Sequence, residues 1–365
     1  MKAVMKGVGS FLVLMVALGM TLPSFAQVSE RSPSASEEAG SVIVFPKFIK
    51  GTATVDGVTK PRTEIEVRAR CPSGASCPAA EPLKIRMHWV CPGSANNTPK
   101  YVCKESDFDV TLSVDGKAEL NPEDPKLREN DVGSIAPCPS GYLIGWVISP
   151  ATERPIKYDG LTGSAIFRDA RGAIESYQAF AIRADPNLAT RAEIATDIDP
   201  RTGTPALVFD GGAGHYQAVA AAIPEELEYH QLIGPLSSGE AFLILLTLDI
   251  RANRPNYPII FDLDFRSDQG GRTSASRSFI CWTEIQNPNI DTRFTLAGAR
   301  TRDAVVISGQ AIKVPVPSGG ISDIPGPVTL MGLVPTDAGR SRSMDQAYIL
   351  KQLGGTKPKT VFVPF

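Results

Sequence analysis

LKIRMHW, at residues 83–89, decides the fold class. Its apolar side chains, at Leu83, Ile85, Met87 and Trp89, alternate with basic ones. A period of two places alternate side chains on opposite faces of a β-strand. One apolar and one polar face is typical of an antiparallel sheet that packs on a core with one side and meets water with the other. We therefore predict a strand here that buries the four apolar side chains.

Two further stretches repeat this alternation. TEIEVRAR, at residues 63–70, predicts burial of Ile65, Val67 and Ala69; DFDVTLSV, at 107–114, predicts burial of Phe108, Val110, Leu112 and Val114. Asp115-Gly116 follows directly and is the strongest two-residue hairpin signal in the chain. The chain also contains 30 prolines and 32 glycines, which favour turns over long helices.

These patterns predict an all-β, mainly antiparallel protein with an immunoglobulin-like β-sandwich architecture, built as one large sandwich or two packed ones. We expect one or two short helices, with residues 187–195 and 224–232 as the candidates. The second candidate begins with Pro224 and two glutamates, as a helix N-terminus prefers.

The N-terminus has the pattern of an export signal. Lys2 and Lys6 precede an apolar run at residues 11–20, and Ser24 and Ala26 fit the small-residue positions of a cleavage site before Gln27. We expect an exported protein, periplasmic or extracellular, with no membrane span after cleavage. Loss of the two lysines moves the formal charge from −2 to −4, which argues against a nucleic-acid partner.

Composition divides the remaining chain. Residues 27–39 contain almost nothing apolar and predict a disordered leader. The polar stretch at 185–205 predicts a linker between a disulfide-stapled β-sandwich domain at 40–184 and a second β domain at 206–340. Residues 341–365 then form a C-terminal extension, and residues 1–26 are the signal peptide.

The six cysteines predict disulfides, because their number is even and an exported protein meets an oxidising compartment. They are Cys71, Cys77, Cys91, Cys103, Cys138 and Cys281. All fifteen pairings remain open. Spacing favours Cys71 with Cys77 and Cys91 with Cys103, which leaves Cys138 for Cys281. A zinc site is disfavoured because its cysteine pairs stand two to four residues apart, whereas the intervals here are five and eleven residues.

Residues that carry chemistry are sparse, and we predict no catalytic residue, cofactor or metal site. Of the three histidines, His88 is expected on a solvated strand face, His230 has no partner at a telling spacing, and His215 follows a Gly-rich turn. That turn lacks the third glycine of a dinucleotide-binding loop, so we interpret it as a turn between two strands.

Two other residue groups have weak functional readings. Asp262 and Asp264 alternate along one strand and are weak calcium candidates, although they match no EF-hand loop. Trp89, Trp146 and Trp282 could stack on sugars, but their apolar strand contexts favour the core.

Three stretches together resemble a family of exported, β-rich bacterial proteins whose activity is uncharacterised. They are GSVIVFPKF at residues 40–48, GYLIGWVISPATERPIKYDGLTGSAIFRD at 141–169 and SFICWTEI at 278–285. The resemblance implies export and β structure and carries no catalytic residues. Relatives commonly have a cysteine in a segment like LLTLDI, at residues 245–250, and this chain has none there, so the resemblance gives Cys281 no partner.

We therefore expect a non-catalytic binding or structural module of the bacterial envelope or extracellular space, with an unknown protein or glycan partner. One alternative is a secreted carbohydrate-active hydrolase built on a β-sandwich. Another is a periplasmic assembly factor.

Overall fold

A computed structural model describes residues 39–55, 57–78, 81–92, 103, 105–123, 135–168, 174–199 and 203–217. Beyond these it describes residues 248 and 281 and the strands between Leu227 and Pro364 whose bounds are given below. All of them belong to one unit, Ser32–Phe365. The predicted cleavage pair, Ala26 and Gln27, and the leader up to residue 38 lie outside the described residues.

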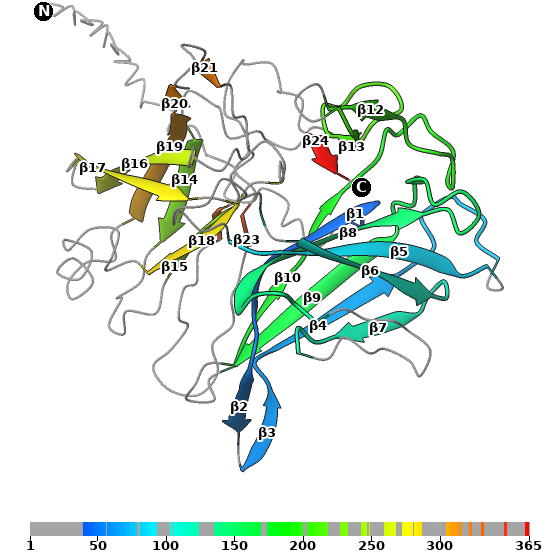
Figure 1. The fold of residues 1–365 in the computed structure, drawn as a ribbon, viewed down its shortest axis with the longest axis horizontal. Helices are drawn as coiled ribbons and strands as arrows, with labels where there is room; N and C mark the ends of the chain where they lie inside the picture. The colour runs from blue at the N-terminus through cyan, green and yellow to red at the C-terminus, as the bar shows by residue number, and fades with distance from the viewer. Residues whose placement is uncertain are drawn as a thin grey trace, which may run out of the picture. The chain divides into compact units, whose positions relative to one another are not determined.

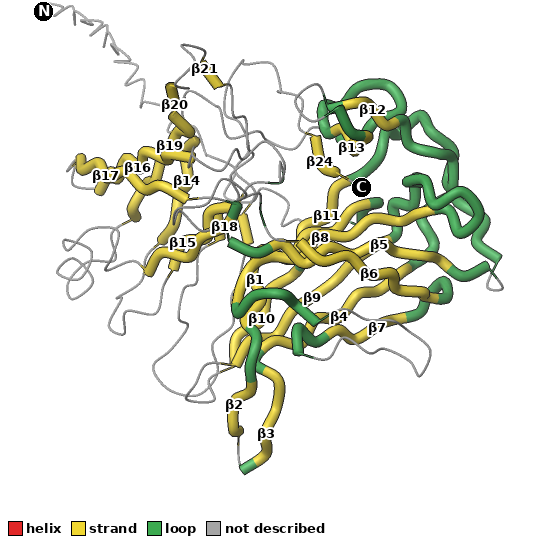
Figure 2. Tube along the Cα trace, in the orientation of Figure 1, coloured by secondary structure: helices red, strands yellow, loops and turns green. Residues whose placement is uncertain are grey.

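The described part of the chain is all-β, and its strand pairs are antiparallel (Figures 1 and 2). Two sheets dominate the part before residue 185. The first has five strands in the order β11 (Phe180–Ile182), β1 (Val42–Ile49), β8 (Ser140–Ile148), β5 (Leu83–Val90) and β6 (Glu105–Leu112). The second has four, in the order β10 (Ile174–Gln178), β9 (Leu161–Arg168), β4 (Thr63–Ala69) and β7 (Lys117–Leu120).

The two sheets pack on each other through the apolar faces that the sequence predicts. The predicted inward residues of β4 and β5 are at most 1 % exposed, as are Val110 and Leu112 of β6. A Cβ on Gly163 of β9 would meet the ring of Phe45 of β1, so these two strands approach closely across the layer. We call this side of the five-stranded sheet, which carries Phe45 and Trp89, its inner face.

The opposite, outer face of the five-stranded sheet is also buried along its middle strands. β1 and β8 are buried at nearly every position, because both are almost continuously apolar rather than alternating. Apolar residues of β15 (Phe242–Leu246) and β18 (Trp282–Gln286), including Ile244 and Leu246, belong to the same apolar cluster as β1 and β8. His88, predicted to lie in water on this face, is instead buried, with 3 % of it exposed.

The Asp115-Gly116 turn forms, but the predicted hairpin around it is wrong. Gly116 donates to the carbonyl oxygen of Ser113, and Asp115 adopts a left-handed φ of 62°. The strands on either side join different sheets, since β6 pairs with β5 whereas β7 pairs with β4. The turn therefore carries the chain from one layer to the other. The chain crosses again at Ala179, between β10 and β11.

A two-stranded hairpin occurs instead at β2 (Thr52–Val55) and β3 (Val58–Pro61), around Gly57. Gly57 has a φ of 76°, a conformation that glycine adopts without a steric penalty. The hairpin extends away from the sheets after β1 (Figure 1), and Val58 is 54 % exposed.

Neither predicted helix is found in the described residues. Residues 187–195 form turns and a single β-bridge, in which Ile156 pairs with Glu193. Residues 227–232, from the second candidate, form strand β14, which pairs along its whole length with another strand. Local helix preference lost here to cross-strand hydrogen bonding and packing. Among the described residues there is no helix long and apolar enough to cross a membrane.

The later part of the chain contributes further antiparallel sheets. A four-stranded sheet has the order β14 (Leu227–Leu232), β19 (Ala304–Ile312), β16 (Ile259–Ser267) and β17 (Arg272–Phe279). A three-stranded sheet joins β12 (Thr196–Ile198), β13 (Pro205–Val208) and β24 (Phe362–Pro364). Short pairs are β15 with β18, β20 (Val314–Pro315) with β21 (Ile321–Ser322), and β22 (Leu330–Met331) with β23 (Ala347–Tyr348).

The domain boundaries drawn from the sequence stay a prediction. The structure shows that residues assigned to the second domain, Leu207, Phe209 and Tyr216, lie in the same apolar cluster as the first two sheets. Val363, from the predicted extension, lies there as well.

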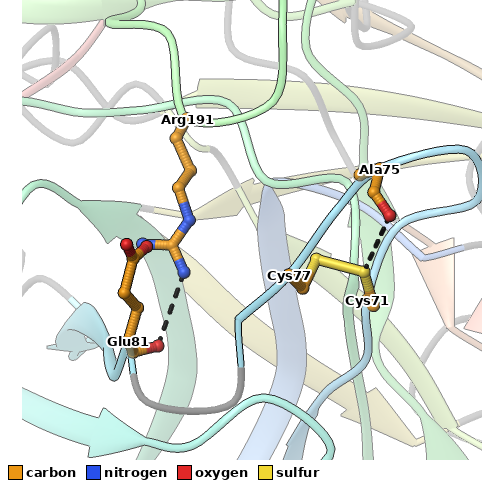
Figure 3. The surroundings of a disulfide bond; sticks show 5 residues. All are labelled: Cys71, Ala75, Cys77, Glu81 and Arg191. Carbon is orange, nitrogen blue, oxygen red and sulfur yellow. Dashed lines mark hydrogen bonds and ion pairs between the residues drawn. A yellow bond between two sulfur atoms is a disulfide. The ribbon is translucent and has the colours of Figure 1, made fainter.

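All six cysteines form disulfides, and two of the three pairs differ from those that spacing favours. Cys71 bonds Cys77 as expected, with Cys71 Sγ also 3.4 Å from the carbonyl oxygen of Ala75 (Figure 3). Cys91, however, bonds Cys138, and Cys103 bonds Cys281. The end of β5 and the start of β6 lie side by side, as spacing suggests, yet Cys91 and Cys103 each bond a cysteine from a more distant part of the chain.

Candidate functional site

Three side chains with metal-ligand chemistry meet at one end of the β5–β6 pair. His88 of β5 lies directly opposite Asp107 of β6, and Val90 lies opposite Glu105. Side chains opposite each other across an antiparallel pair share a face, as do residues two apart along a strand. His88, Asp107 and Glu105 therefore project from the outer face. One nitrogen or carboxylate oxygen of each lies within 4.8 Å of those of the other two. We call this group the His88 triad.

His88 is the buried member of the triad. Its ring stacks on the indole of Trp146 of β8, with 4.4 Å between centroids and 19° between planes. Its Nδ1 lies 2.6 Å from Oδ1 of Asp107, whose side chain is 55 % exposed. This contact is an ion pair when the ring is protonated, and neither ring nitrogen has a hydrogen-bond partner among the described residues. The imidazole is thus positioned by stacking rather than by hydrogen bonds.

Ion pairs occupy the same face further along the two strands. Lys84 and Arg86 of β5 both pair with Asp109 of β6, at 2.9 and 3.1 Å, and both reach Glu153. Burial by itself would raise the pKa of Asp109, but hydrogen bonds from Arg86 and Lys84 outweigh it and hold the pKa below its usual range. The two positive and two negative charges of this cluster balance one another.

The Gly-rich segment after β13 is a closed turn. Gly211 donates to Tyr216 and His215 donates to Gly212 through their backbones, and Gly211 and Gly214 have φ of 73° and 79°. Asp210 accepts from the backbone N–H of Gly212 at 2.7 Å and lies 2.9 Å from Nδ1 of His215. His215 and Asp210 therefore stabilise their own loop.

A second carboxylate ties that turn to the neighbouring loop. Asp185 accepts from the backbone N–H groups of Gly214, at 2.7 Å, and Asn187, at 2.9 Å. These two hydrogen bonds, with Gly214 the larger contributor, lower the pKa of Asp185. Hydrogen bonds to the charged form are expected to keep this carboxylate ionised at neutral pH.

The third polar group surrounds a bulge in β1 between Phe45 and Phe48. Within the bulge, the carbonyl oxygen of Pro46 accepts from Nε1 of Trp282, and Lys47 pairs with Glu284 at 2.8 Å. The hydroxyl of Tyr177 donates to the carbonyl oxygen of Lys47 at 2.5 Å. Because these partners come from β18 and β10, the bulge fastens two distant parts of the chain to the centre of the five-stranded sheet.

Comparison with family models, with curated proteins and with solved structures gives no match.

The residues that the sequence singles out as weak calcium candidates, and His230, lie outside the polar groups described above. Asp262 and Asp264 lie in β16, where Asp262 pairs in register with Ser276 and Asp264 with Ser274, but their side chains are outside the described part. The calcium prediction is therefore untested. His230 lies in β14, likewise without a described side chain.

The three tryptophans lie in the core as predicted: Trp89 and Trp146 are fully buried, and Trp282 is 5 % exposed. Sugar stacking on these rings is thereby excluded in the folded chain.

Sequence reasoning missed the His88 triad. LKIRMHW and DFDVTLSV each predict a strand, yet nothing in either indicates that the two strands are neighbours or that His88 faces Asp107. A signal was present in the charges of the two strands. Residues 105–107, ESD, carry two acidic side chains, and His88 lies on a strand whose other polar side chains are basic. Only the strand register turns these separate residues into one cluster.

Proposed function

We propose that the chain is an exported, non-catalytic module of the bacterial envelope or extracellular space that binds a protein or glycan partner or forms part of a surface structure. We also propose that its two main sheets form an immunoglobulin-like sandwich. The resemblance of its three quoted stretches to exported β-rich proteins supports this reading.

The observation that carries the proposal is the set of disulfides. Cys91, Cys103 and Cys281 are at most 3 % exposed, and their bonds connect the end of β5 to the start of β8 and the start of β6 to the start of β18. Disulfides of this structural kind form and persist in oxidising compartments, which favours export. They also make the sheet rigid, which suits a binding or building role.

The carboxylates near the Gly-rich turn also support a non-catalytic role, because they accept hydrogen bonds within the protein. Asp185 and Asp210 are engaged by backbone N–H groups, and Asp159 accepts from Ser41 Oγ at 2.6 Å and from the backbone of Ala184. A glycoside hydrolase needs two carboxyl groups directed at a substrate. Carboxylates that hold loops together are better explained as structure.

The proposal is tested with the purified, oxidised mature protein on a panel of polysaccharides and on envelope fractions. We expect the protein to be retained on one of these polysaccharides or envelope fractions without releasing reducing sugar from it. Turnover of any glycan that disappears on an acid-to-amide change, for example Asp210→Asn, would overturn the non-catalytic reading and favour the hydrolase.

A further inference from the structure

We propose that the His88 triad binds a divalent transition-metal ion of the Zn²⁺ type. One imidazole nitrogen and two carboxylate groups meet within 4.8 Å at the end of the β5–β6 pair. Imidazole and carboxylate are ordinary zinc ligands. The inference does not depend on the proposed function, because a metal site would fit a binding module, a structural module or an enzyme.

Two acidic side chains near a histidine are common on protein surfaces, so the argument rests on His88 itself. Its side chain is 3 % exposed; Nδ1 contacts the Asp107 carboxylate without forming a hydrogen bond, and Nε2 has no hydrogen-bond partner within the described residues. An uncompensated buried polar group costs on the order of 1–3 kcal/mol. Coordination by one ring nitrogen would offset that cost, and Nδ1 already faces the carboxylate of Asp107 at 2.6 Å.

The type of donor decides which ion fits. Ca²⁺ and Mg²⁺ favour shells of six or more oxygen atoms, whereas one nitrogen and two carboxylates suit a borderline ion such as Zn²⁺. Thiolates would favour softer ions, but the chain has no free thiol because all six cysteines are in disulfides. Three protein ligands leave at least one coordination position for water or for a group on a partner.

The surroundings restrict the strands and the ring that carry the ligands. Cys91 follows the last residue of β5 and is bonded to Cys138; Cys103 precedes Glu105 by two residues and is bonded to Cys281. Stacking on Trp146 fixes the plane of the imidazole. Ligands that need little ordering bind with a smaller entropic cost, which favours affinity.

The test uses the oxidised mature protein and Co²⁺ as a spectroscopic substitute for Zn²⁺. We expect a visible ligand-field absorption that saturates at one equivalent and is removed by Zn²⁺. Fluorescence of Trp146 should be quenched in parallel, because its indole contacts the coordinating ring. Trp146→Phe should remove this quenching while the absorption remains.

Variants connect binding to the triad. Asp107→Asn and His88→Gln should each weaken Zn²⁺ binding, measured by calorimetry, by at least about 100-fold, since even second-shell losses cost 10–100-fold. His215→Gln is the matched control: its ring lies 2.9 Å from the carboxylate of Asp210 but outside the triad, so affinity should not change.

Asp107, with its exposed side chain, keeps the test decisive if the buried His88 variant fails to fold. Absence of stoichiometric Co²⁺ and Zn²⁺ binding by the wild-type protein overturns the proposal. So does a folded Asp107→Asn protein that binds as tightly as the wild type.

Discussion

Nε1 of Trp282 donates a 2.8 Å hydrogen bond to the carbonyl oxygen of Pro46, a residue 236 positions earlier in the chain. Pro46 lies in the β1 bulge, where the ladder to β8 shifts register and its carbonyl needs another partner. The neighbouring ion pair between Lys47 and Glu284 follows the same path from β1 to β18. The bulge is therefore one of the points at which the later part of the chain is fastened to the first sheets.

Replacing Trp282 with phenylalanine should destabilise the protein by more than the packing loss alone. The change leaves the buried carbonyl of Pro46 without its donor, which costs about 1–3 kcal/mol. Denaturant unfolding under non-reducing conditions measures the loss. Trp146→Phe is the comparison, because Nε1 of Trp146 has no hydrogen-bond partner within the described residues. Unchanged stability of the Trp282→Phe protein would show that the bond contributes nothing.

Removing the Cys103–Cys281 disulfide should cost more stability than removing Cys71–Cys77. The bonds close sequence separations of 178 and 6 residues, and chain entropy gives about 5 and about 2 kcal/mol for them. The two double variants, Cys103→Ala with Cys281→Ala and Cys71→Ala with Cys77→Ala, are compared by urea unfolding. Equal midpoints for the two would contradict this account of how the later part of the chain is held.

The sequence predicts what is local in this fold. Alternation in β4, β5 and β6 correctly identifies Ile65, Trp89 and Val110 as buried, because a period of two depends only on neighbouring residues. The Asp115-Gly116 turn is likewise correct as a turn. Its failure as a hairpin has a non-local cause: β7 finds its partner in β4, which precedes it by more than forty residues.

The same limit applies to the cysteines and the candidate site. Cys91 and Cys103 are close in sequence and flank neighbouring strands, yet each bonds a cysteine elsewhere. The alternation of its strand predicts His88 in water, whereas its ring is buried and stacks on Trp146 of β8, more than fifty residues later. Register and layer packing determine both outcomes, and neither can be read from one stretch of sequence.

Asp185 should make the folded state sensitive to acid. Hydrogen bonds from Gly214 and Asn187 lower its pKa in the folded protein, so its contribution to stability is present above the unfolded-state pKa. That contribution is lost as pH falls through the lower, folded-state pKa. Asp185→Asn should therefore reduce stability at neutral pH and flatten the acid limb of a plot of unfolding free energy against pH.

The control for this change is Asp197→Asn, on the exposed strand β12, where the carboxylate accepts from the backbone N–H of the next residue and from no other described group. It should leave the acid limb nearly as in the wild type. An acid limb that responds equally to both changes would show that general surface charge, and not the Asp185 loop contact, sets the acid sensitivity.

Disulfide mapping by mass spectrometry, on protein exported with its own leader and digested without reduction, tests the central claim most directly. We predict a mature N-terminus at Gln27 and linked peptides for Cys71–Cys77, Cys91–Cys138 and Cys103–Cys281. Reduced cysteines in a protein retained in the cytoplasm would contradict export. A Cys91–Cys103 peptide would contradict the architecture that joins β6 to β18.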